Sequence, residues 1–224
     1  MSYTLEDAQY DMYMADEGAR LLYEEHRERA ITEFTTERLR SYYVEHPALV
    51  APALQALADS RQLLGVHTGA ALVFAASAVE LGIKGVLLRP VVYGLVHQES
   101  TAALITDLVI SHTSFDRFRD LLFQILTEHG GTDLRAAKRP GASKLLWEEI
   151  AGVQANRNAL IHRGERPDME QAGLSVEVAT TVLEQLIPSV LHHLGLHLHD
   201  AVRVCARAVC QAETPNAAGR ITTA

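Results

Sequence analysis

The chain has 224 residues, of which 48% are hydrophobic and 21% charged, an ordinary globular composition that can bury a substantial core. The formal charge of −8 argues against nonspecific nucleic-acid binding over the whole surface, and two cysteines are too few for a disulfide framework. The acidic residues near Met1 and the shortness of the most apolar run predict neither a signal peptide nor a membrane span. Because the cysteines are also few, we expect a cytoplasmic protein without membrane contact.

The N-terminal region, residues 1–45, is expected to be an amphipathic helical extension. Nine acids and three arginines give residues 1–33 a charge of −6, which predicts a solvated acidic face. Pro47 then interrupts the helical pattern. We therefore divide the chain into this extension, a helical bundle over residues 46–212 and a flexible tail over residues 213–224.

Residues 67–88 are rich in small side chains that allow neighbouring helices to approach closely, and we expect them to form the central core helix. Within it, Glu80 and Lys84 stand at i and i+4, the spacing of an ion pair on one helix face. Glu80 has two interpretations: an ordinary ion pair, or an acid that faces the helix of the candidate site and orients a residue there. Pro90 predicts a connector over residues 89–100.

Two further helices are expected over residues 101–110 and 115–126, followed by a basic loop that glycines and a proline bracket. Beyond residue 168 a last helical region is expected to run to about residue 211, kinked or divided at Pro188. These patterns predict an all-α protein, an up-and-down helical bundle with an extra N-terminal helical region.

The helix before this last region, expected over residues 143–163, carries the candidate site. Its apolar stripe consists of Leu146, Ile150, Val153 and Leu160. Arg157 falls on the stripe, where a long charged side chain must reach water or meet a partner. Asn158 and His162 stand at i and i+4 and can touch on a second face. A second interpretation makes His162 and Arg163 only favourable cations before a glycine helix stop, but it leaves Arg157 unexplained.

A local basic zone surrounds this helix. Seven bases and three acids give residues 134–166 a charge of +4, which could bind a phosphate backbone in spite of the acidic total. Chance scatter of surface charge is an equal alternative. If the zone is functional, its substrate contacts are Arg135, Lys138, Arg139, Lys144 and Arg163.

A histidine-rich segment, residues 192–199, raises the question of a metal site. On a helix, His193 and His197 would share a face, but zinc needs a third or fourth ligand, for which only Asp200 and Cys205 are near. Solvated or packed histidines are the more common outcome, so we expect no metal and no cofactor.

The segment from Arg157 to His162, Arg-Asn-Ala-Leu-Ile-His, resembles the Arg-x4-His motif of the HEPN superfamily of all-helical domains, which often has asparagine after the arginine. The resemblance covers roughly residues 60–200, because an alanine-rich helix with a glutamate precedes the motif and a long helix follows it. It implies a homodimer in which Arg157 and His162 of both subunits line one cleft. One toxin subgroup has tyrosine two residues after the histidine, and the chain departs from it with Gly164.

The resemblance implies metal-independent RNA cleavage, in which the ribose 2′-hydroxyl attacks the adjacent phosphate and leaves a 2′,3′-cyclic phosphate. His162 would transfer protons, Arg157 would hold the phosphate, Asn158 would orient either of them, and Glu80 would fix the guanidinium. A toxin or anti-phage role would add a cognate antitoxin or a defence-system partner. Because some HEPN domains are not catalytic, the alternative is a module that binds RNA, a nucleotide or a protein, and a plain helical interaction protein is a third hypothesis.

Overall fold

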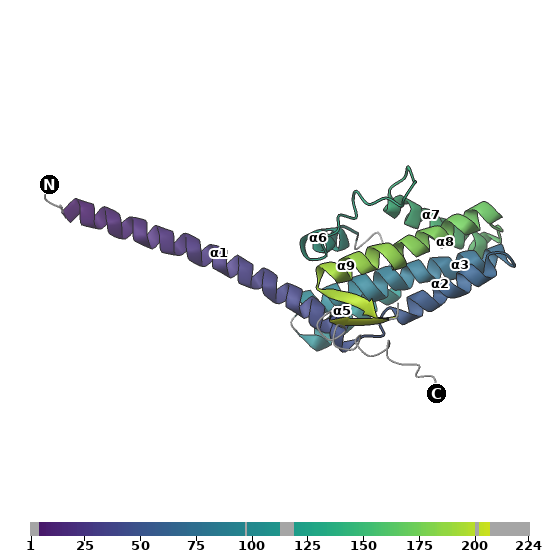
Figure 1. Ribbon diagram of the computed structural model, residues 1–224, viewed down its shortest axis with the longest axis horizontal. Helices are drawn as coiled ribbons and strands as arrows, with labels where there is room; N and C mark the ends of the chain where they lie inside the picture. Colours follow the sequence, from purple (N-terminus) through teal and green to yellow (C-terminus); the bar gives the residue numbers. More distant parts are fainter. Residues whose placement is uncertain (1–4, 97, 113–118, 200–201, 207–224) are drawn as a thin grey trace, which may run out of the picture.

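The computed structural model describes residues 5–96, 98–112, 119–199 and 202–206. Over these residues the protein is mostly helical, as the sequence predicts, with one small two-stranded hairpin (Figure 1). The helices and strands are α1 (Leu5–Glu45), α2 (Ala51–Leu63), α3 (Thr68–Glu80), η1 (Leu81–Leu88), α4 (Arg89–Leu95), α5 (Glu99–His112), α6 (Arg119–His129), α7 (Leu146–Arg163), α8 (Met169–Thr181), η3 (Val182–Leu186), α9 (Ile187–His193), β1 (Leu196–His199) and β2 (Arg203–Ala206). As expected of the core helix, α3 contacts α2, α7 and α8.

The helix that begins with α3 does not stop at Pro90, so the predicted connector over residues 89–100 is wrong for its first half. The chain passes through the π-helix η1 and continues as α4 to Leu95. Pro90 has no N–H to donate to the carbonyl of Val86, four residues earlier. The buried Tyr43 hydroxyl donates to that carbonyl instead, at 2.7 Å. A side chain from α1 therefore compensates for a residue that normally ends a helix.

The second long helix, α8–η3–α9, also passes through a π-helical turn and then a proline, Pro188. It packs closely on the first. A methyl group added to Gly82 in η1 would lie 2.7 Å from Cδ2 of Leu183 in η3, closer than carbon atoms can approach. This contact confirms that small residues of the core helix permit close approach of its neighbours.

The prediction that the last helix runs to about residue 211 is wrong. The helix ends at His193, and Gly195 follows with a φ of 71°, in the left-handed region that glycine adopts freely. Strands β1 and β2 then pair antiparallel. Val204 is buried, and its N–H donates to the carbonyl of Pro47 at 2.9 Å, so the hairpin is held against the α1–α2 junction. The predicted tail lies outside the described residues.

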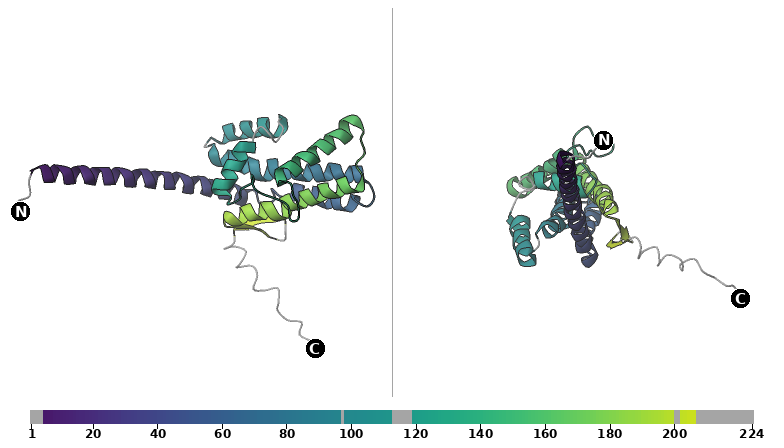
Figure 2. Two further views of the ribbon diagram at one scale, coloured as in Figure 1. Left: turned by 90° about the horizontal axis from the view of Figure 1, so that it is seen from above. Right: turned by 90° about the vertical axis from the view of Figure 1, so that its left-hand side faces the viewer.

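Helix α1 extends far from the bundle as a single rod (Figures 1 and 2). Its C-terminal end is held to α4, where Arg38 donates to the carbonyls of Tyr93 and Val96 at 2.8 and 3.0 Å. Beyond that end, large apolar side chains such as Met12 and Tyr23 are exposed. The extension is therefore helical as predicted, and its apolar side chains are exposed together with its acidic ones.

Two helical segments, Thr68–Leu95 and Met169–His193, are long and apolar enough to cross a membrane by length and composition alone. In each, 61% of the most apolar window is buried inside the protein. The first exceeds the short apolar run seen in the sequence because the helix continues through Pro90. Core helices of soluble proteins, which are mostly buried, also reach this length and apolar composition.

Candidate functional site

Helix α7 presents the motif, and local signals define both of its ends. The side chain of Glu148 accepts a hydrogen bond from the N–H of Leu145 at 3.2 Å, which satisfies one free donor at the start of the helix. Gly164 ends the helix with a φ of 72°. The helix begins at Leu146, three residues later than expected, because the N–H of Leu146 still bonds to the loop carbonyl of Ala137.

Arg157 lies at the edge of the buried stripe and is partly exposed. Its Nη1 lies 3.4 Å from Oδ1 of Asn158, a long hydrogen bond. Within the described part of the chain, no carboxylate pairs with Arg157. The guanidinium thus reaches solvent from an apolar stripe and keeps most of its donors available for a ligand.

Asn158 and His162 are both exposed on the outer face of α7. The predicted contact between them does not form in the part of the chain described, since Asn158 engages Arg157 instead. The imidazole of His162 is open to solvent on the last turn of α7. Its accessibility is compatible with proton transfer to a bound molecule.

Glu80 lies away from Arg157. Helices α3 and α7 run antiparallel, since Gln154 donates to the carbonyl of Ala76 at 3.3 Å while Leu160 packs against Gly69. In this register Glu80 is about seven residues, or roughly 10 Å along the helix axis, from the level of Arg157.

Glu80 instead accepts from Nζ of Lys84 at 2.7 Å, and the Lys84 side chain is only 12% exposed. The ion-pair interpretation of these two residues is therefore confirmed. Both line a separate pocket of about 420 Å³ on η1, together with Ser77 and Arg89. The proposed role of Glu80 in fixing the motif guanidinium has no support in this geometry.

The basic loop does not surround the motif. Lys144 precedes α7, so thirteen residues separate it from Arg157, about 20 Å along the helix. Lys138 and Lys144 are exposed at that far end, and Arg135 packs its guanidinium over the Phe123 ring, 5.6 Å from the centroid. The predicted basic zone is thus split between the two ends of α7.

The side chain of Arg139 forms hydrogen bonds within the fold. It donates to Glu149 through Nη2 at 3.1 Å and Nε at 3.3 Å, and to Glu177 through Nη1 at 2.6 Å. The Glu149 side chain is 5% exposed. Hydrogen bonding to Glu149 raises the pKa of Arg139, the direction expected for a guanidinium that neutralises a buried acid. Arg139 therefore ties the loop to α7 and α8 and is a poor candidate for substrate binding.

Arg163 is paired as well, with the exposed carboxylate of Glu165. The hydrogen bond from Arg163 lowers the pKa of Glu165. Of the basic residues named as substrate contacts, Arg163 is the one that lies beside the motif. Its pairing with an exposed acid is weak in water and would yield to a phosphate.

A hollow of about 580 Å³, which no sequence pattern indicates, lies beside the C-terminal end of α7. Leu160, Arg166 and the start of α3 line it, where the ring of His67 accepts from the N–H of Ala70 at 3.0 Å. Several large apolar side chains around this end are exposed, namely Val66, Phe74, Ile161 and Met169. An exposed apolar group of this kind is typical of an interaction surface.

Comparison of the chain with protein-family models, with curated proteins and with solved structures gives no match.

Proposed function

We propose that this protein is a metal-independent endoribonuclease of HEPN type that acts as a homodimer. The observation that carries the proposal is Arg157. Arg157 lies on an apolar stripe and has no acid beside it among the described residues, whereas Arg139 toward the other end of α7 and Arg163 beside the motif are both paired. A guanidinium with free donors, five residues and about 140° round the helix from an open imidazole, suits an anionic substrate.

The chemistry follows from these two groups. Arg157 binds the non-bridging oxygens of a phosphodiester and stabilises the charge that grows on them during attack. The 2′-oxygen forms a bond to phosphorus while the bond to the 5′-oxygen breaks, which leaves a 2′,3′-cyclic phosphate and a 5′-hydroxyl. One proton must leave the 2′-hydroxyl and one must reach the 5′-oxygen. His162 from each of two subunits supplies a base and an acid.

The dimer is supported by the apolar side chains next to the motif. Ile161 is 50% exposed and lies on α7 between Asn158 and His162 in sequence. Phe74 and Met169 are exposed nearby. Covering these side chains with the same face of a second copy would bring two Arg157–His162 pairs together and make a closed interface.

The test is cleavage of RNA by the purified full chain in the presence of a chelator, with a DNA copy as substrate control. Product with a 2′,3′-cyclic phosphate and an intact DNA copy are expected, because DNA lacks the nucleophile. His162→Ala should lower the rate by about 10²–10⁴-fold and Arg157→Ala by about 10²–10³-fold. Both side chains reach solvent, so both variants should keep wild-type thermal unfolding.

Lys144→Ala is the matched control, a basic side chain at the other end of α7 that should leave the cleavage rate unchanged. Ile161→Glu should separate the dimer in analytical ultracentrifugation and abolish cleavage together with it. Equal cleavage of DNA, or full activity in His162→Ala, overturns the proposal. RNA binding without any cyclic-phosphate product would favour the non-catalytic module.

The setting we propose for this activity is the cytoplasm, in a toxin or anti-phage role. A ribonuclease of this kind needs control in its own cell, so a cognate antitoxin or defence-system partner is part of the proposal. The acidic, exposed helix α1 is the part of the chain most available for such a contact.

A further inference from the structure

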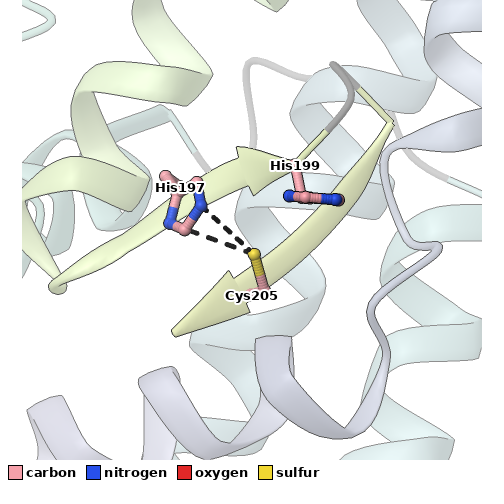
Figure 3. Close-up of side chains that lie close together, drawn as sticks. All are labelled: His197, His199 and Cys205. Carbon is pink, nitrogen blue, oxygen red and sulfur yellow. Dashed lines mark hydrogen bonds between the residues drawn. The ribbon is translucent and has the colours of Figure 1, made fainter. Parts of the chain in front are cut away.

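The hairpin brings together three side chains that metals bind. His197 and His199 alternate along β1 and therefore share one face of the strand, and Cys205 of β2 pairs with His197 across the ladder. One donor atom from each residue lies within 4.8 Å of the other two. Cys205 Sγ is 3.3 Å from Nε2 of His197, and the three side chains converge in Figure 3.

We propose that His197, His199 and Cys205 form a binding site for one Zn²⁺ ion per chain. Zinc favours thiolate and imidazole ligands, at about 2.3 Å for sulfur and 2.0–2.1 Å for nitrogen. In a tetrahedral site those lengths separate a sulfur from a nitrogen donor by about 3.5 Å. The observed separation of Sγ and Nε2, 3.3 Å, is close to this value, and a ring nitrogen of His199 lies within 4.8 Å of both donors.

The register of the hairpin brings the three side chains together, and a helix over the same residues could not do so. On a continued helix, His197 and His199 would point about 200° apart and could not hold one ion. The strand conformation places both histidines on one face of β1, and Cys205 lies on the same face of the paired strand β2. All three residues are only partly buried, which leaves a path for the ion and a fourth position for water or another ligand.

A metal here would stabilise a weak part of the fold. Each strand has four residues, and an isolated two-stranded hairpin is marginally stable in water. Apart from the ladder, the hairpin is anchored by the buried side chains of Leu196 and Val204 and by the bond from Val204 to Pro47. An ion that joins β1 to β2 would hold the hairpin closed at the α1–α2 junction. Its role would be structural and separate from the phosphate chemistry proposed for α7.

The experiment is a titration of the full-length, chelator-treated protein with Co²⁺, followed by competition with Zn²⁺. One Co²⁺ per chain should bind with a thiolate-to-cobalt charge-transfer band in the near ultraviolet, and Zn²⁺ should displace it. Cys205→Ser should abolish the band, and His197→Ala and His199→Ala should each weaken binding by more than about tenfold. His193→Ala is the matched control, an exposed histidine on α9 that should bind as the wild type does.

Affinity should fall with falling pH, because the ligands must lose their protons to bind the ion. Zn²⁺ should also raise the thermal unfolding temperature of the wild type but not of Cys205→Ser. The absence of a charge-transfer band, or equal binding by Cys205→Ser, overturns the proposal. Removal of the ion should leave the rate of RNA cleavage per folded molecule unchanged, so the two proposals fail independently.

Discussion

Replacing Arg139 with methionine tests whether this arginine holds the fold together or contacts substrate. The substitution leaves the carboxylate of Glu149, with a side chain 5% exposed, without its guanidinium partner. Removing one partner of a buried ion pair costs about 3–5 kcal/mol. Because Arg139 itself is 19% exposed, we expect the lower end, about 3 kcal/mol. For a chain of this size that loss corresponds to about 6–12 °C in the unfolding temperature.

The assay is urea unfolding followed by the fluorescence of Trp147, the only tryptophan in the sequence. Its ring packs edge-on against Phe123, with centroids 5.0 Å apart, so it reports on α7 directly. Glu177→Gln is the matched control. That carboxylate also binds Arg139 but is 61% exposed, and its loss should cost less than about 1 kcal/mol.

A double variant, Arg139→Met with Glu149→Leu, should recover most of the lost stability, because no buried charge remains. Cleavage of RNA per folded molecule should stay at the wild-type level in all three variants. If Arg139→Met is no more destabilised than Glu177→Gln, then Glu149 is effectively solvated and the reasoning is refuted. Normal stability combined with lost RNA binding would restore Arg139 as a substrate contact.

Three further predictions concern the scaffold. Tyr43→Phe removes the hydrogen bond to the carbonyl of Val86 and should cost about 1–2 kcal/mol in thermal unfolding. Burial also raises the pKa of the Tyr43 phenol. Above the ordinary tyrosine pKa of about 10, Tyr43 therefore ionises in the unfolded chain before it does in the folded protein, and the free energy of unfolding falls as the pH rises. Tyr43→Phe should make this loss of stability with pH smaller. Gly82→Ala should be less stable than Gly85→Ala by about 1–2 kcal/mol in urea unfolding, since an added methyl meets Leu183 at the first position and nothing within 4 Å at the second. Deletion of residues 1–30 should shift the unfolding temperature by less than about 3 °C in calorimetry, because this part of α1 stands away from the bundle; a larger loss would mean that it packs against the protein.

The sequence by itself determined the features that depend on near neighbours in the chain. The apolar stripe and Gly164 defined helix α7 to within three residues, because burial periodicity and left-handed glycine caps act over one or two turns. The pair of Glu80 and Lys84 was predictable for the same reason. The position of Arg157 on the stripe was also readable, and its partly exposed side chain takes the first of the two outcomes expected there, contact with water or with a partner.

Tertiary structure alone decided features that need a partner distant in the chain. The helix continues through Pro90 because α1 supplies the Tyr43 hydroxyl. A hairpin forms in place of the predicted helix, and the carbonyl of Pro47 accepts a hydrogen bond from the N–H of Val204 in its second strand. The pairing register of β1 and β2 brings the two histidines and Cys205 together.

The same holds for the charges around the motif. Composition showed one basic zone, but the length of α7 separates its two ends by more than any side chain can reach. Glu149, a buried acid on α7, forms an ion pair with Arg139, whereas no acid among the described residues pairs with Arg157. Sequence patterns give the direction in which a side chain leaves its helix, whereas the groups it meets belong to other elements, and folding alone brings those together.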